Sequence, residues 1–287
     1  SALRAPHMKT LELAAYMRLT PLPPDIYRSI SFDAGGTLLL STGPASDGSL
    51  VLDPLGPAGE RRVLSTPDCP LPIVQRFLDG RWLVYGAWDG TTVVADIYSA
   101  DLDHLSRFDV GHCVNRILID PRDRIWVAYG DENPLGILRY SDRGEIAFDL
   151  NSSFDRCVCD IYSMHMEAGS DIWFYTYPDF PLARIRDEQV SVEIEACPVT
   201  GAKHVLTGDD HLVFFGSYAT AFRLHDRLDV YVHDRRCGSG ETVVFLADGR
   251  PIHCTATVAT HAETAAILCS EAIYLVQLSD LVAAVKD

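Results

Sequence analysis

Residues 115–131, NRILIDPRDRIWVAYGD, hold two short apolar runs on either side of a polar turn. The runs ILI and IWVAY are rich in β-branched and aromatic side chains, which favour strands. Pro, Asp and Arg between them are typical of a tight connection. The stretch therefore predicts a β-hairpin, and its recurrence along the chain decides the fold.

The same plan returns five more times. The relatives are SISFDAGGTLLLSTG (29–43), VQRFLDGRWLVYGAWDG (74–90), YSMHMEAGSDIWFYTYPD (162–179), KHVLTGDDHLVFFGSYA (203–219) and the weaker TATVATHAETAAILCSE (255–271). The six starts, near 29, 74, 115, 162, 203 and 255, lie about 40 to 50 residues apart. Two further apolar runs follow a hairpin, for example GILRYSD and GEIAFDLN in the third unit. Four-stranded units of this period are the blades of a β-propeller.

We therefore expect an all-β, six-bladed β-propeller with four-stranded blades. The last unit has only three strands, ending with AIYLVQL, whereas the N-terminal segment 10–19 has no partner of its own. We expect residues 10–19 to supply the missing outer strand of blade six and to close the ring, which hides open sheet edges. The alternative is an amphipathic N-terminal helix with Leu11, Leu13 and Met17 on one face.

Composition and charge narrow the class of partner. The 287 residues carry 24 basic and 40 acidic side chains, a formal charge of −16, which disfavours nucleic acid and anionic membranes. No apolar run is long enough to span a bilayer, and no secretory signal is recognisable, so a cytoplasmic location is expected. Residues 1–7 have the character of an expression-vector remnant, which leaves residues 8–287 as a single propeller domain.

The repeat pattern also resembles known families. RIWVAYGD and DIWFYTYP resemble the inner strand pairs of NHL and regucalcin-gluconolactonase-like propellers. CDIYSMHM, YTYPDFPLARIRD and LADGRPI resemble actinobacterial hypothetical propellers of unassigned activity. The resemblance implies the fold, and fold does not carry function with it.

In a propeller, the loops that enter the first strands and the loops between strands two and three surround one mouth of the central channel. Ile172, Trp173, Phe174 and Tyr175 occupy the packing positions of their hairpin, whereas the three candidates that follow them extend into such a loop. The candidate ligand-binding residues at this mouth are Arg28, Trp88, Asp89, Tyr162, Tyr177, Asp179, Phe180, Lys203, His204 and Tyr218.

Hard oxygen donors at the same mouth suggest an alternative metal site for Ca²⁺, Mg²⁺ or Mn²⁺. The candidates are Asn115, Asp131, Glu132, Asn133 and Asp160. The resemblance to gluconolactonases implies a Glu, Asn and Asp metal set, but YRSISFD places Arg28 where an acid would be expected. The carboxylates of GDEN can equally form a solvated loop.

Thiols recur before the first strands of five units, at Cys69, Cys113, Cys157, Cys159, Cys197 and Cys254. His112, Cys113, Cys157 and Cys159 form the candidate thiol site, because thiolate and imidazole suit Zn²⁺. The alternative is that small cysteines fill one repeated packing niche.

Two functions follow. The first is a recognition propeller that binds a small molecule, peptide or protein at the channel mouth. The second is an enzyme, either a metal-dependent lactonase or hydrolase, or a lyase or cyclase of a biosynthetic pathway. The catalytic residues are unknown in either case, and no cofactor is assigned with certainty.

Overall fold

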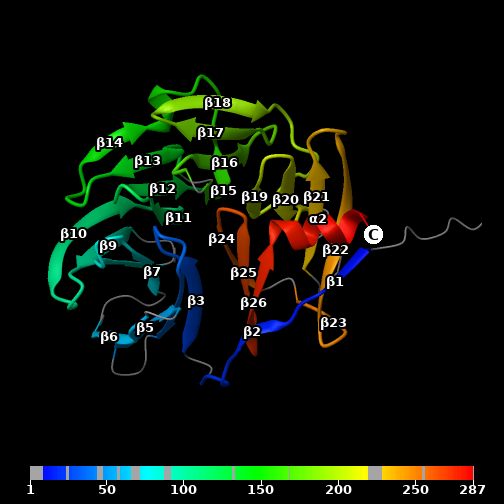
Figure 1. The fold of residues 1–287 in the computed structure, drawn as a ribbon. Helices are drawn as coiled ribbons and strands as arrows, with labels where there is room; N and C mark the ends of the chain where they lie inside the picture. The colour runs from blue at the N-terminus through cyan, green and yellow to red at the C-terminus, as the bar shows by residue number, and fades with distance from the viewer. Residues whose placement is uncertain are drawn as a thin grey trace, which may run out of the picture.

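In a computed structural model, the chain forms six small antiparallel sheets arranged in a ring (Figure 1). The structure describes residues 9–23, 26–43, 48–56, 59–65, 72–86, 92–130, 133–167, 169–218, 228–253 and 256–286. The expected all-β, six-bladed β-propeller with four-stranded blades is confirmed, and the N-terminal segment supplies the outer strand of blade six.

Each blade runs outward from an innermost strand. Blade one contains β3 (Tyr27–Phe32), β4 (Leu38–Gly43), β5 (Ser49–Leu55) and β6 (Arg62–Ser65). Blade two contains β7 (Pro72–Arg76), β8 (Trp82–Gly86), β9 (Val93–Tyr98) and β10 (His104–Gly111). Blade three contains β11 (Val114–Ile119), β12 (Ile125–Tyr129), β13 (Ile137–Tyr140) and β14 (Ile146–Asp149). A short 3₁₀ turn, η1 (Leu150–Ser152), follows β14. Blade four contains β15 (Asp160–Met166), β16 (Ile172–Tyr177), β17 (Leu182–Arg186) and β18 (Gln189–Ile194). Blade five contains β19 (His204–Thr207), β20 (His211–Phe215), β21 (Asp229–Asp234), β22 (Ser239–Ala247) and the short β23 (Arg250–Pro251). Blade six contains β24 (Thr257–His261), β25 (Thr264–Leu268) and β26 (Ala272–Gln277).

The buried apolar side chains lie between the blades. In the described part of the chain they form six clusters, one at each interface between neighbouring blades. Ile172, Trp173, Phe174 and Tyr175 of β16 are all buried, and they divide between the interfaces on the two faces of blade four. Because a strand alternates its side chains between the two faces of a sheet, every blade contributes to two interfaces.

The N-terminal segment closes the ring, but as two strands rather than one. β1 (Lys9–Glu12) pairs parallel with β22 at the outer edge of blade five, and β2 (Ala15–Arg18) pairs antiparallel with β26 in blade six. Between them, Leu13 donates its backbone N–H to Leu246 at 2.8 Å, and its side chain is buried in the cluster between the two blades. The helix alternative is wrong, and the single strand over residues 10–19 is corrected to two. The break lets the segment pass from one sheet to the next.

The C-terminal helix α2 (Leu278–Lys286) follows β26 directly and lies across the ends of blades five and six (Figure 1). Its Leu278 and Leu281 are buried in the same cluster as Leu13. Among the described residues, no helix has the length and apolar character needed to span a bilayer. Both ends of the described chain therefore stabilise one interface of the ring.

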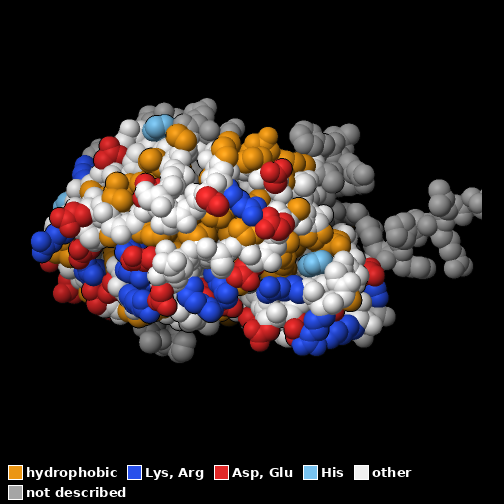
Figure 2. Space-filling model, turned by 90° about the horizontal axis from the view of Figure 1, so that it is seen from above, with side chains coloured by type: hydrophobic (Ala, Val, Ile, Leu, Met, Phe, Trp, Pro, Cys, Tyr) orange, Lys and Arg blue, Asp and Glu red, His pale blue; other side chains and the backbone are white. Residues whose placement is uncertain are grey.

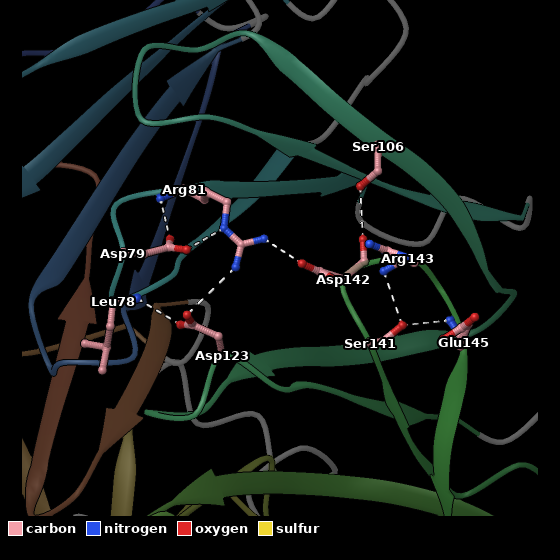
Figure 3. Close-up of polar contacts among 9 residues, drawn as sticks. All are labelled: Leu78, Asp79, Arg81, Ser106, Asp123, Ser141, Asp142, Arg143 and Glu145. Carbon is pink, nitrogen blue, oxygen red and sulfur yellow. Dashed lines mark hydrogen bonds and ion pairs between the residues drawn. The ribbon is translucent and has the colours of Figure 1, made fainter.

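On the face formed by the turns between strands one and two, Arg81 connects blades two and three (Figure 3). Its Nε lies 2.6 Å from Asp79 Oδ2 in its own turn, and its Nη1 lies 2.9 Å from Asp142 Oδ2 in blade three. Its Nη2 lies 3.8 Å from Asp123 Oδ2, and Asp123 also accepts the backbone N–H of Leu78 at 3.1 Å. This shared guanidinium holds the two turns together on the side opposite the candidate site.

Figure 2 shows the rim of the ring from the side of β17 and β18, where acidic and basic side chains are mixed with apolar patches. Charged side chains of β17 are paired, Arg184 with Glu193 at 2.9 Å and Arg186 with Asp171 at 2.6 Å. The negative net charge is therefore not gathered into one acidic patch on this rim.

The two N-terminal strands should be essential for stability. A chain that begins at Thr20 would expose the edges of β22 and β26 and lose the burial of Leu11, Leu13 and Met17, on the order of 5 kcal/mol. We expect its midpoint of thermal unfolding to fall by roughly 10 °C, with a tendency to associate. Circular dichroism and light scattering test this. An unchanged midpoint in a monomeric truncated chain would show that the ring does not need this closure.

Candidate functional site

The structure brings four of the predicted ligand-binding residues together between blades four and five. Tyr162 lies in β15, and Tyr177 is the last residue of β16. Phe180 lies in the loop after β16, and Tyr218 lies after β20. The ring centroid of Phe180 lies 5.6 Å from that of Tyr162, 5.7 Å from Tyr218 and 5.7 Å from Tyr177. The hydroxyls of Tyr162 and Tyr218 share a hydrogen bond. Together with Tyr175 below, these residues form what we call the aromatic cluster.

Within the aromatic cluster, Phe180 forms the floor and Tyr177 the exposed edge. Phe180 is 7% exposed and stacks on Tyr175 at 5.3 Å, whereas Tyr177 is 42% exposed. The turn that places them has two consecutive residues in the left-handed region, Asp179 at φ 66° and Phe180 at φ 51°. Such backbone is uncommon for residues other than glycine and often lies at functional sites. Sequence reasoning expected Phe180 to face the channel like Tyr177, but it packs inward.

Gly201 allows Tyr218 to lie against the backbone of blade five. Its φ is 74°, and a Cβ at this position would collide with the Tyr218 ring. Tyr218 also donates its backbone N–H to the carbonyl of Thr200 at 2.9 Å. The orientation of the ring is therefore fixed from behind.

The predicted oxygen donors lie apart from this cluster. Asn115 Nδ2 donates to Asp160 Oδ1 at 2.9 Å and to the Ile161 carbonyl at 3.1 Å, which links blades three and four. Asn133 is buried, donates from Nδ2 to the His112 carbonyl at 2.9 Å and accepts the Leu135 N–H at 3.2 Å. The candidates Asp131, Glu132, Trp88 and Asp89 lie outside the described residues.

Only two of the four thiol-site candidates lie together. Cys157 Sγ is 3.5 Å from Cys159 Sγ, while Cys113 is buried one blade away, with φ 56°, and the side chain of His112 is exposed. Burial raises the pKa of the Cys197 thiol to about 12, so this cysteine is protonated at neutral pH. Within the described ranges, no three His, Cys, Asp or Glu side chains converge as metal ligands would. Cys69 and Cys254 lie outside these ranges.

The remaining cationic candidates lie in two different blades, separated by blade six. Arg28 of blade one donates from Nη2 to the Thr20 carbonyl at 2.7 Å, and partial burial lowers its pKa. Lys203 of blade five is exposed and is followed by His204. The structure therefore does not bring Arg28 to the aromatic cluster.

Sequence reasoning missed Arg116, which extends into the central channel from β11. Its Nη2 lies 2.7 Å from Nδ1 of His204 and 3.5 Å from the carbonyl of Val258, and its Nη1 lies 3.1 Å from the carbonyl of Met164. These partners belong to the innermost strands of blades four, five and six, or border them. One side chain from blade three reaches all three blades only at the axis of the ring. The signal was a charged residue inside the apolar run NRILI.

The Arg116 contact fixes the state of His204. A guanidinium only donates hydrogen bonds, so Nδ1 of His204 accepts and its proton lies on Nε2. Burial, followed by the charges of Arg116 and Lys203, lowers the pKa of His204 well below its usual value. His204 is therefore neutral at physiological pH.

His165 lies deeper, on β15. It is 1% exposed, and neither ring nitrogen has a hydrogen-bond partner among the described residues. Burial lowers its pKa to about 3, and the nearby charges of His261 and Arg116 act in the same direction, against the backbone of Ala262. Met164 and Met166 pack between blades three and four, so alternation places His165 on the opposite face of the strand. We call Arg116, His165 and His204 the channel cluster.

Known structures share the fold at low sequence identity. A catalytically inactive virginiamycin B lyase from Staphylococcus aureus, crystallised with quinupristin, is 14% identical over 90% of this chain and 98% of that one, with a TM-score of 0.51. A chain of a nidogen/laminin complex is 15% identical over 75% of this chain and 78% of that one, with a TM-score of 0.47. A Bacteroides caccae protein of unknown function is 13% identical over 78% and 84%, at 0.49. The likeness to the lyase shows the fold alone.

Comparisons of the sequence itself give no relative. No protein-family model matches the chain, and no curated protein matches it. The function therefore has to be argued from the site.

Because His165 is buried in its neutral form, we expect the protein to lose stability as the pH falls. Its pKa is about 3 when folded and 6.5 in the unfolded chain, so the unfolded state takes up a proton first as the pH falls. Its contribution is present above pH 6.5 and is lost toward pH 3, about 2 kcal/mol of it by pH 5. The free energy of unfolding is measured in urea at pH 7.5 and at pH 5. Between these two pH values, His165→Gln should lose about 2 kcal/mol less of it than the wild type. The exposed His112→Gln is the control, and equal losses in all three proteins would contradict the assignment.

Proposed function

We propose that the protein is a recognition propeller that binds a small molecule at the channel mouth, against the aromatic cluster. The observation that supports this is the exposed edge of Tyr177, which lies on a packed floor of Phe180 and Tyr175. A rigid floor with a projecting aromatic ring offers contact area at little conformational cost, as binding sites do. The Tyr162 and Tyr218 hydroxyls add a polar group beside the rings.

The surroundings of the aromatic cluster support recognition more than bond cleavage. Burial raises the pKa of the Tyr175 hydroxyl, which also hydrogen-bonds the carbonyl of Val199, so this phenol does not act as a base at neutral pH. Asp179 is exposed at the rim, where it is positioned to contact a ligand rather than to be desolvated. The cluster thus supplies shape and polarity, with no general base identified in it among the described residues.

The second candidate, a metal-dependent hydrolase or a lyase, depends on the Asn115–Asp160 pair. This pair brings an amide and a carboxylate together between blades three and four. Asn115 directs its Nδ2 at two acceptors, Asp160 and the Ile161 carbonyl, so its amide would have to rotate to present oxygen to a cation. The likeness to the lyase supports this candidate only at the level of the fold.

Tyr177 gives the sharpest test of recognition. We screen a defined metabolite library by thermal shift and saturation-transfer NMR, then compare the wild type with Tyr177→Ala. Truncation of an exposed aromatic contact should weaken a bound metabolite by about tenfold or more, equivalent to about 1.4 kcal/mol. Tyr16→Ala is the matched control, because Tyr16 is similarly exposed, at 48%, on the outer strand β2. Metabolites that bind both variants as tightly as the wild type would contradict the proposed site.

A metal titration separates the two functions. The recognition function predicts no saturable rise of the unfolding midpoint with Ca²⁺, Mn²⁺ or Zn²⁺ in protein purified without a metal column. A bound metal at a hundredfold excess over its dissociation constant would add about 2.7 kcal/mol. A rise of that size that Asp160→Asn abolishes would instead support the metal-dependent enzyme.

A further inference from the structure

We propose that the channel cluster is an anion-binding site, in which Arg116, assisted by His165, binds the carboxylate or phosphate group of a small molecule inside the propeller channel. The inference rests on the proposed function in one respect, since it names the acidic group of the ligand recognised at the same mouth. The site itself is defined by the contacts of Arg116 alone and is tested without the aromatic cluster.

The first argument is the charge of Arg116. Its three hydrogen-bond partners are two backbone carbonyls and a neutral imidazole, and within the described residues no carboxylate lies within 4.0 Å of its guanidinium. Arg124 and Arg139, which are also partly buried, pair with the acids Asp120 and Glu188. A charge removed from bulk water without a counter-charge is costly, so the channel favours an anion beside it.

The second argument is His165, whose buried imidazole has no partner in the described structure. Buried polar groups are almost always hydrogen-bonded, so an unpartnered buried imidazole is suited to a bound water or anion as its partner. A neutral imidazole carries one N–H that can donate to an anion while Arg116 supplies the charge.

Other polar atoms of the innermost strands agree with this. Within the described chain, buried side-chain atoms without partners include Gln75 Oε1 on β7, Thr207 Oγ1 on β19 and Thr260 Oγ1 on β24. With His165 on β15, they occur on four of the six innermost strands, which surround the axis. Unpartnered polar atoms on strands that surround the axis agree with a polar ligand there rather than an apolar one.

The positive charge of Arg116 at the axis differs in sign from the net charge of the chain. A formal charge of −16 repels anions from the outer surface, whereas Arg116 supplies a positive charge at the axis. A guanidinium is planar and can bind two oxygens of a carboxylate or phosphate at once, which a lysine ammonium cannot do. Arg116 already donates from Nη1 to one partner and from Nη2 to two, so Nε–H and the second N–H of Nη1 are the donors left for a carboxylate or phosphate oxygen.

The test uses inorganic phosphate and malonate as separate probes on the full chain. Unfolding midpoints at pH 7.5 are followed against each probe, with sodium chloride at matched ionic strength as the reference. We expect the unfolding midpoint of the wild type to rise with the probe and to saturate. For Arg116→Gln and for Arg116→Lys, the probe concentration at half-saturation should be at least tenfold higher. Arg107→Gln is the matched control, because Arg107 is an exposed arginine on β10 that pairs with Asp96. Saturation by phosphate at lower concentration identifies a phosphate ligand, and saturation by malonate a carboxylate.

A second readout does not depend on stability. In the wild type labelled with ¹⁵N-histidine, the probe should shift the side-chain resonances of His165 and His204, with His165→Gln used to assign them. Equal midpoint rises in the wild type and Arg116→Gln, or unshifted histidine resonances at saturation, would overturn the site and show only a general salt effect. If Arg116→Gln does not fold, Arg116→Lys and the histidine resonances still decide.

The same probes separate this inference from the proposed function. Phosphate and malonate are too small to need the aromatic cluster, so Tyr177→Ala should bind them like the wild type. Metabolite binding that depends on Tyr177 but is unchanged in Arg116→Gln would overturn the anion site and leave the proposed function intact. Phosphate binding that depends on Arg116, with no metabolite that depends on Tyr177, would support the anion site and contradict the aromatic one.

Discussion

Every blade of this protein is a sheet that must bury both of its faces, and no blade can do so alone. The six apolar clusters lie between blades, so the stability of each blade depends on its two neighbours and the ring has to close. Closure occurs at blades five and six, where β1, Leu13, β2 and α2 converge on one interface. The innermost strands of the six blades surround the axis of the closed ring, and the side chain of Arg116 contacts three of them there.

That geometry explains why the candidate site has two layers. At the mouth, the loop after β16 and the loop after β20 come from neighbouring blades and bring Tyr177, Phe180 and Tyr218 together. Deeper along the axis, Arg116 contacts groups from three other blades. The upper layer offers shape and the lower layer charge, and both depend on the ring holding the blades at fixed distances.

The candidate residues differ in how far the sequence could place them. Tyr162, Tyr177 and Tyr218 were found because the loops of a propeller mouth can be identified once the repeats are aligned. The inward turn of Phe180 could not be found, since it depends on two left-handed residues and on the packing of Tyr175. The sequence predicts Asn115 and Asp160 as oxygen donors, but the structure shows the amide of Asn115 donating to Asp160.

The sequence by itself determined the all-β class, the six repeats and the closing role of the N-terminus, because strand periodicity and repeat length are local properties of the chain. The tertiary structure alone decided that the N-terminal segment splits at Leu13 between two blades, and that Arg116 meets His204 across the channel. Arg116 and His204 are 88 residues apart in the chain. Their contact depends on the curvature of the closed ring, which no local pattern of residues encodes.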